Sequence, residues 1–182
     1  MTKLYLVRHG KARAGWNENL DPGLDDQGGR QAAEVAQALA PLGPLDLLSS
    51  PLARARETCQ LLAEIWEVTP RIEERVGEIP SPTEVLEERG RWLVELMGKK
   101  WQDLGPELQS WRQGIIQALC ELDADAVVFT HFIAINVVVG EARGDSRVVC
   151  FLPANGSITM VEANGGELSL VELGIEAHTR VR

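Results

Sequence analysis

The sequence predicts a mixed α/β fold, a three-layer α/β/α sandwich built around a mostly parallel central sheet. Short, continuous apolar runs that are typical of buried strands occur at 4–7, 45–50 and 126–130. Each run is followed by a segment in which apolar residues recur at helical spacing. Strands that alternate with helices favour a parallel sheet with helices packed on its faces. The 182 residues are enough for one domain with a sizeable core.

The first strand, 4–7, ends at Arg8-His9-Gly10, where we expect Gly10 to allow a close turn. Residues 16–29 are polar and rich in turn formers, which indicates a loop. The spacing of apolar residues predicts a helix over 30–43 that ends at its Pro and Gly residues. The strand at 45–50 leads into a helix to residue 66, with Ser50 as its N-cap and Pro51 at its first position.

The middle of the chain predicts a helical cap. Residues 67–85 are irregular, with one short strand near their start, and 84–122 are helical with a break near 103–107. Trp92, Trp101 and Trp111 are interpreted as core of this segment. We expect a single domain over 1–182, with a cap insertion at about 79–122 over one sheet edge. A separate domain is the weaker alternative.

The last third of the chain contains a clear apolar strand at 126–130 and a predicted helix at 131–140. The β-branched residues of 131–140 count against a helix. Residues 148–174 alternate in polarity and carry Asn-Gly and Gly-Gly turn signals. They predict three short strands, the last two forming a hairpin.

Composition narrows the classes of partner and compartment. A net charge of −9 argues against a general nucleic-acid or anionic-membrane binder, although a local basic pocket could still hold a phosphorylated substrate. No run approaches the roughly 20 apolar residues of a membrane helix, and the first residues do not resemble a signal peptide. The three cysteines are far apart and odd in number, so neither a zinc site nor a disulfide framework is expected. These features predict a cytoplasmic protein.

Two histidines follow predicted parallel strands. His9 comes after 4–7 and His131 after 126–130. Because ligands of open parallel sheets bind at the carboxyl ends of the strands, we expect both imidazoles at one edge. Arg8 and Arg54 reach the same edge, and guanidinium groups match phosphate oxygens. The residues therefore predict a phosphate pocket without metal or cofactor, in which a neutral imidazole could attack phosphorus. Arg56 is expected to face solvent.

Four segments resemble the histidine phosphatase superfamily, the phosphoglycerate-mutase-like proteins. "LVRHG" is similar to its N-terminal motif, and "LDDQGGRQA" (24–32) resembles the family's "LTxxGxxQA". "SSPLARARET" (49–58) resembles "SSPLxRAxxT", and "VVFTH" (127–131) resembles the strand that carries the second histidine. The four segments occur in the family's order.

The resemblance implies a phosphoglycerate-mutase-like fold and a set of roles. His9 would be the nucleophile that becomes a phosphohistidine, and Arg8, Arg54 and His131 would bind the phosphoryl group. A carboxylic acid would protonate the leaving oxygen. "ERVGEI" (74–79) resembles the family's "ERLREI" and assigns this acid to Glu78, with Glu73 as the alternative because Gly77 follows it by four residues.

Some positions depart from the family pattern. Phe132 follows the second histidine, where the family usually has Gly, and its ring could narrow the pocket or shift the helix start. Lys11 stands where many members have Glu. The family's Trp-Asn pair comes two residues late, so Asn17 is not assigned as a phosphate contact. His178, in the polar tail, is given no catalytic role.

The predicted function is a metal-independent phosphatase that hydrolyses a small phosphomonoester through a phosphohistidine. One alternative is a protein phosphohistidine phosphatase, because "RHGKA" resembles the "RHGxA" form of those relatives. Another is a non-catalytic phospholigand-binding module. A mutase is disfavoured because no second basic cluster is seen for another phosphate.

Overall fold

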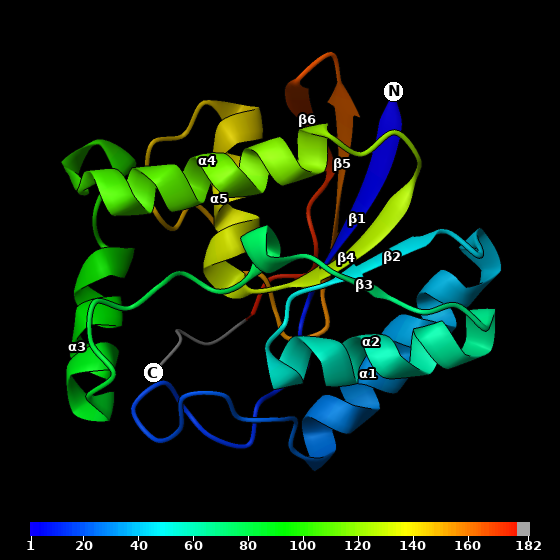
Figure 1. Ribbon diagram of the computed structural model, residues 1–182, viewed down its shortest axis with the longest axis horizontal. Coiled ribbons are helices and arrows are strands. Elements are labelled where there is room, and N and C mark those ends of the chain that lie inside the picture. The colour runs from blue at the N-terminus through cyan, green and yellow to red at the C-terminus, as the bar shows by residue number, and fades with distance from the viewer. Residues whose placement is uncertain (178–182) are drawn as a thin grey trace.

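A computed structural model describes residues 1–177 and contains a six-stranded sheet between two helical layers (Figure 1). In chain order the elements are β1 (Thr2–Arg8), α1 (Asp26–Leu39), η1 (Ala40–Leu42), β2 (Asp46–Ser49), α2 (Ala53–Trp66), β3 (Arg71–Ile72), η2 (Glu74–Val76), α3 (Leu86–Met97), η3 (Trp101–Asp103), α4 (Pro106–Cys120), β4 (Ala126–Thr130), α5 (Phe132–Arg143), β5 (Ile158–Asn164) and β6 (Glu167–Glu172). The predicted α/β sandwich is confirmed.

The sheet order is β3-β2-β4-β1-β5-β6. Strands β1 to β4 run parallel to one another, and β5 and β6 complete one side as antiparallel strands. The prediction of a mostly parallel sheet is therefore confirmed. The two central strands, β1 and β4, pair with Arg8 opposite Thr130, so the residues that follow them emerge at the same level of the sheet.

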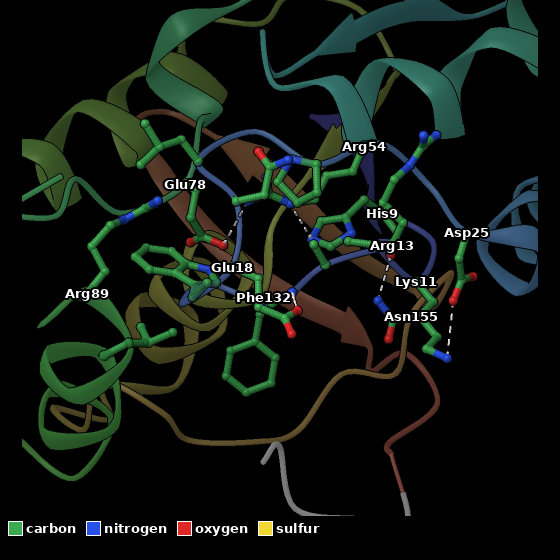
Figure 2. A pocket seen from close by; sticks show the side chains of 18 of the residues that line it. His9, Lys11, Arg13, Glu18, Asp25, Arg54, Glu78, Arg89, Phe132 and Asn155 are labelled. Atoms are coloured by element: carbon green, nitrogen blue, oxygen red, sulfur yellow. Dashed lines mark hydrogen bonds and ion pairs between the residues drawn. The ribbon is translucent and has the colours of Figure 1, made fainter. Parts of the chain in front are cut away.

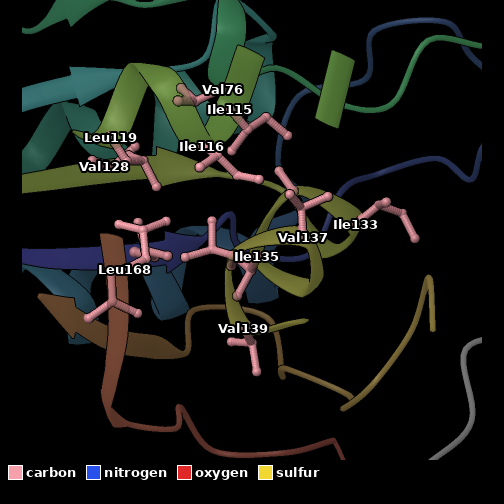
Figure 3. Packing of buried hydrophobic residues seen from close by; sticks show 14 of the residues in the cluster. Val76, Ile115, Ile116, Leu119, Val128, Ile133, Ile135, Val137, Val139 and Leu168 are labelled. Atoms are coloured by element: carbon pink, nitrogen blue, oxygen red, sulfur yellow. The ribbon is translucent and has the colours of Figure 1, made fainter. Parts of the chain in front are cut away.

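The continuous apolar runs arise because both faces of the central strands are covered. Successive side chains point to opposite faces, so Leu4 and Leu6 join one core cluster while Val7 joins the other. Helices α1 and α2 cover one face, and α4 and α5 cover the other (Figure 1). Figure 3 shows the cluster beneath α4 and α5, where residues of both helices pack against β4 and Leu168 of β6.

Helix α5 forms despite its β-branched residues. Every residue from Phe132 to Gly140 is buried, so the helix lies within the core rather than on its surface. Such burial outweighs the few tenths of a kcal/mol per residue by which Val and Ile disfavour a helix. The predicted helix is confirmed, and tertiary packing is the reason for it.

Two predicted helix starts are wrong. Helix α1 begins at Asp26 rather than Arg30, because the Asp25 side chain accepts a hydrogen bond from the Gly28 N–H and acts as the N-cap. In α2 the N-cap is Leu52 rather than Ser50, and Pro51 lies outside the helix. The free N–H of Ala53, the first residue of the helix, instead donates to Asp21 Oδ1 at 2.9 Å.

The helical middle is broken as predicted, with Gly105 before the first residue of α4. Trp101 is buried, and Trp92 and Trp111 are partly buried against the same cluster, so their interpretation as core is confirmed. Helix α4 belongs to the helical layer over the sheet, whereas α3 stands beside it (Figure 1).

The C-terminal segment forms two strands within the described residues, not the three that its alternation predicts. Strands β5 and β6 make the expected hairpin, and Gly165 and Gly166 both have positive φ at its turn. Residues 148–157 are mostly irregular, and the Gly156 N–H near their end donates to the carbonyl of Arg8 at 3.0 Å. Within residues 1–177, no helix combines the length and apolar character needed to span a bilayer.

Candidate active site

The two strand-end histidines meet at the carboxyl edge of the sheet, as their positions predict. His9 follows β1 and its backbone N–H donates to the Thr130 carbonyl at 3.1 Å. The ring centroids of His9 and His131 lie 5.2 Å apart. Both residues are buried, with 7% and 0% of their surface exposed. The register of β1 and β4 is therefore what brings the imidazoles together (Figure 2).

The ring of His9 is held by a hydrogen bond at each of its nitrogens. Its Nδ1 lies 2.7 Å from the Gly10 carbonyl oxygen, so Nδ1 carries the proton and donates. Its Nε2 accepts a hydrogen bond from Arg54 Nε at 3.1 Å. Burial, with Arg54 and Arg8 nearby, holds the pKa of His9 well below its usual value. The imidazole is therefore neutral, with the Nε2 lone pair on the side of Arg54.

Two guanidinium groups lie at the same edge. Arg54, on the first turn of α2, is 5% exposed and its Nη2 lies 3.8 Å from Glu78 Oε2. Arg8 Nη1 donates to the Pro153 carbonyl at 2.7 Å. Burial lowers the pKa of Arg8 to about 10, which leaves it charged at neutral pH. The edge thus holds two positive charges beside a neutral imidazole.

Helix α5 begins at Phe132, directly after His131, which is its N-cap. The Phe132 ring lines the pocket, and the Arg8 guanidinium lies 5.0 Å from the ring centroid. A guanidinium over an aromatic face is attracted by the ring quadrupole. The ring at this position therefore supports Arg8 where the family's usual glycine would not.

Glu78 lies in the same group of side chains (Figure 2). Its side chain is 8% exposed, and its Oε2 lies 3.7 Å from His131 Nδ1. Its Oε1 accepts the N–H of Ile79 at 3.0 Å. Burial raises the pKa of the Glu78 carboxyl, against the opposing charge of Arg54. A carboxyl group with a raised pKa is suited to donate a proton.

Glu73, the alternative acid, lies elsewhere. Arg75 Nε donates to Glu73 Oε1 at 2.9 Å, and this hydrogen bond lowers the pKa of Glu73. Glu73 does not line the pocket, whereas Glu78 does. The geometry therefore favours Glu78.

His131 is oriented by Ser50, which the sequence predicts to be a helix N-cap. Its Nε2 lies 2.7 Å from Ser50 Oγ, so the predicted helix cap is instead the partner of an imidazole. Burial and the charge of Arg54 hold the pKa of His131 well below its usual value. Its Nδ1 is buried and has no hydrogen-bond partner within residues 1–177, and it faces Glu78.

The pocket in front of these groups has a volume of about 470 Å³. Five basic side chains and three acidic ones line it, although the chain as a whole carries −9. The concentration of positive charge that a phosphate site requires is therefore present. Within the described residues, no three His, Cys, Asp or Glu side chains cluster as metal ligands would.

Several contacts of the site are absent from the sequence prediction. Asn155 Nδ2 donates to the His9 carbonyl at 3.1 Å, from the irregular segment before β5. Thr58 Oγ1 accepts the Gly10 N–H at 3.0 Å and donates to the Arg54 carbonyl at 2.6 Å. Thr58 and Ser50 lie in the "SSPLARARET" motif, so the motif could have indicated that they belong to the site. Nothing local marks Asn155, because its contact joins positions 146 residues apart.

The remaining predicted positions are also placed. Arg56 and Asn17 are exposed and lie outside the pocket lining. Lys11 lines the pocket and its Nζ lies 3.1 Å from Asp25 Oδ2. His178 lies outside the described residues.

Gly10 is required by a close approach rather than by a turn. A Cβ at Gly10 would lie 2.5 Å from the Gly28 carbonyl oxygen, and a Cβ at Gly28 would overlap the Lys11 carbonyl oxygen. The start of α1 thus packs directly on the backbone that follows His9. Larger residues at either position would push the backbone of His9 to Lys11 away from the helix.

We expect Gly28→Ala to lower the free energy of unfolding by about 1–3 kcal/mol, because the added methyl group meets backbone atoms that cannot move alone. Gly29→Ala is the matched control in the same helix, since its Cβ would meet nothing within 4 Å. It should raise stability by up to about 1 kcal/mol. Urea unfolding of the two variants measures both changes, and equal stabilities would contradict the proposed packing.

Comparison with known proteins assigns the family. The family model of the histidine phosphatase superfamily (branch 1) matches residues 4–176. The chain belongs to this superfamily. The resemblance carried by the four sequence motifs is therefore confirmed.

Curated histidine phosphatase relatives include probable phosphoglycerate mutases GpmB. The protein of Erwinia tasmaniensis is 30% identical over 122 residues, which cover 64% of this chain and 50% of the relative. The protein of Klebsiella pneumoniae is 29% identical over the same coverage. The chain spans about half the length of these relatives.

Solved structures match nearly the whole chain. A phosphoserine phosphatase mutant from Entamoeba histolytica, in complex with phosphoserine, is 26% identical with a TM-score of 0.69, and covers 94% of this chain and 96% of its own. TTHB049 from Thermus thermophilus is 25% identical with a TM-score of 0.63, covering 97% and 100%. YhfR from Bacillus stearothermophilus, 18% identical, has a TM-score of 0.77 and covers 98% and 99%, which shows the same fold.

Proposed function

We propose that this histidine phosphatase superfamily member is a metal-independent phosphatase that hydrolyses a small phosphomonoester through a phosphohistidine. The observation that carries the proposal is the placement of a neutral His9, with Arg54 on its Nε2, beside the buried carboxyl of Glu78. Nucleophile, positive charge and proton donor are thereby within one pocket.

In the first step, the substrate phosphoryl group draws Arg54 Nε away from His9 Nε2, which frees the Nε2 lone pair. His9 Nε2 then attacks phosphorus, and the bond from phosphorus to the ester oxygen breaks. The Nδ1 proton, held on the Gly10 carbonyl, stabilises the charge that develops on the imidazole. Arg8 and Arg54 line the pocket and interact with the phosphoryl oxygens as negative charge redistributes. The resemblance assigns His131 the same role, but its side chain is fully buried and does not line the pocket. Glu78 transfers its proton to the leaving oxygen, so the product is a neutral alcohol.

In the second step, water attacks the phosphohistidine. The Glu78 carboxylate accepts a proton from the water as the P–N bond breaks, and the electron pair returns to His9 Nε2. Inorganic phosphate leaves, and both groups regain their starting protonation. Neither step needs a metal ion to neutralise the phosphoryl charge, because two guanidinium groups already lie at the site.

We further propose that residues 1–182 form one domain. Within the predicted cap insertion at 79–122, we propose that only the first part, which contains α3, covers the pocket. Helix α3 supplies Arg89, Leu93 and Met97 to the pocket wall. Helix α4, by contrast, packs its buried residues in the core cluster over the sheet. The proposed substrate is small, since it must fit between α3 and the nucleophile, and the proposed location is the cytoplasm.

A mutase is the second candidate, because the curated relatives carry that name. A mutase must return the phosphoryl group to an acceptor hydroxyl, whereas a phosphatase gives it to water. A protein phosphohistidine phosphatase and a non-catalytic binding module remain alternatives. The buried Glu78 beside His131 counts against a module that only binds.

Steady-state assays separate these functions. We expect hydrolysis of p-nitrophenyl phosphate with the same rate in the presence and absence of a chelator. With 3-phosphoglycerate, we expect release of inorganic phosphate and no 2-phosphoglycerate. Loss of activity with chelator, or isomerisation faster than phosphate release, would overturn the proposal, and cleavage of a phosphohistidine peptide alone would support the protein phosphatase.

A further inference from the structure

The peptide unit that follows His9 is held on both sides by side chains from distant parts of the chain. Asn155 Nδ2 donates to the His9 carbonyl at 3.1 Å (Figure 2). On the other side of the same unit, the Gly10 N–H donates to Thr58 Oγ1 at 3.0 Å. This peptide unit therefore cannot rotate without breaking a hydrogen bond.

The next peptide unit carries the carbonyl that directs the ring of His9. Its Gly10 oxygen lies 2.7 Å from His9 Nδ1 and accepts the proton of that nitrogen. Its N–H, which belongs to Lys11, donates to Gln31 Oε1 at 2.8 Å. Because a peptide unit is planar and trans, its oxygen and its N–H point in opposite directions. The hydrogen bond to Gln31 on one side therefore fixes the direction of the carbonyl on the other.

Helix α1 places Gln31 for this contact. A Cβ at Gly156 would lie 3.2 Å from the Gln31 Cβ, so the helix packs closely on the segment that contains Gly156. A backbone N–H can only donate, so the amide atom that meets the Lys11 N–H is the oxygen. Gln31 does not line the pocket, and its effect on the site must therefore pass through the backbone.

Substrate binding makes the Gly10 carbonyl more important. In the free protein both ring nitrogens of His9 have partners, since Nε2 accepts Arg54 Nε at 3.1 Å. The proposed reaction draws Arg54 toward the phosphoryl group, and Nε2 is then free to attack. From that point the hydrogen bond to the Gly10 carbonyl keeps the proton on Nδ1. A proton on Nε2 instead would remove the attacking lone pair.

We propose that Gln31 is a positioning residue that acts through the Gly10–Lys11 peptide unit and holds His9 in the tautomer protonated at Nδ1. This inference rests on the proposed phosphohistidine mechanism, because that mechanism needs a free Nε2. Without the Gln31 oxygen, the Lys11 N–H can turn toward water, and the Gly10 carbonyl turns with it. The ring then loses the group that selects its tautomer.

Gln31→Met removes the acceptor and keeps the length of the side chain. We expect the single-turnover rate of phosphoryl transfer to His9 to fall about threefold to tenfold. Inhibition by inorganic phosphate should stay unchanged, because Arg8 and Arg54 still bind the phosphoryl group. Gln27→Met is the matched control, since Gln27 is an exposed glutamine of α1 whose Oε1 lies 3.4 Å from a side-chain atom, Lys11 Nζ. An unchanged rate in Gln31→Met, or an equal loss in both variants, would overturn the inference.

Nitrogen NMR of the imidazole rings reads the tautomer without turnover. The chain has three histidines, so the signals are few, and those of His9 are the ones missing from His9→Ala. Arg54→Met removes the donor on Nε2, as substrate binding does, and this variant should keep a protonated Nδ1. Adding Gln31→Met should give a mixture of the two tautomers. Adding Gln31→Glu instead keeps an oxygen acceptor and should retain the single tautomer.

These outcomes separate the role of Gln31 from the proposed function. A purely structural contact would change stability and leave the tautomer as it is, so a single tautomer in Arg54→Met with Gln31→Met would contradict the inference. If wild type hydrolysed no phosphomonoester while the tautomer still depended on Gln31, the phosphatase proposal would be refuted and the positioning role would stand.

Discussion

His9→Ala is expected to abolish phosphatase activity, with kcat reduced roughly 10³-fold or more. The reason is that Nε2 of His9 is the nucleophile, and water attacking the ester directly lacks the positioned lone pair. The arginines remain in the variant, so it should still bind phosphate. Hydrolysis of p-nitrophenyl phosphate measures the loss, and Arg56→Gln, an exposed position on α2, is the control.

Covalent trapping gives the same prediction a second readout. Wild type that is mixed with labelled substrate and quenched in alkali should carry one phosphoryl group on His9, identified by peptide mass. His9→Ala should carry none. Full activity in His9→Ala, or a phosphoryl group on another residue, would contradict the mechanism. Circular dichroism of the variant separates loss of chemistry from loss of fold.

Glu78→Gln is expected to lower kcat about 10²-fold or more, because the amide cannot protonate the leaving oxygen or accept a proton from water. The loss should be greater for an alkyl phosphate than for the nitrophenyl ester, whose leaving oxygen needs less protonation. Glu73→Gln is the matched control, since Glu73 pairs with Arg75 outside the pocket. A larger loss in Glu73→Gln would assign the acid to Glu73 instead.

The pH dependence follows from the same two groups. Attack on the ester needs neutral His9 and protonated Glu78. Because the pKa of Glu78 is raised by burial, kcat/KM should fall as pH rises through that raised pKa, and Glu78→Gln should remove this decrease. The pKa of His9 is lowered, so its protonation should not reduce the rate as pH falls through its usual value of about 6.5. Comparison of wild type with Glu78→Gln cancels the titration of the substrate.

Where sequence reasoning was less accurate, the errors have a common cause. Helix α2 takes its capping acceptor from Asp21 rather than from Ser50, and Ser50 instead faces His131. The N-cap rule assumes that the acceptor is local, but here a loop 32 residues away supplies it. Similarly, Gly10 is explained by the approach of Gly28, which no local pattern reveals.

The sequence by itself determined the order of strands and helices as far as α5, the mostly parallel sheet and the edge at which His9 and His131 meet. Apolar runs and strand-end positions carry this information, because a strand buried on both faces must be apolar throughout. Only the tertiary structure decided that Glu78 lies against His131 Nδ1 while Glu73 pairs with Arg75. Both are glutamates in one irregular segment, and their separation depends on which contacts the folded backbone brings within reach.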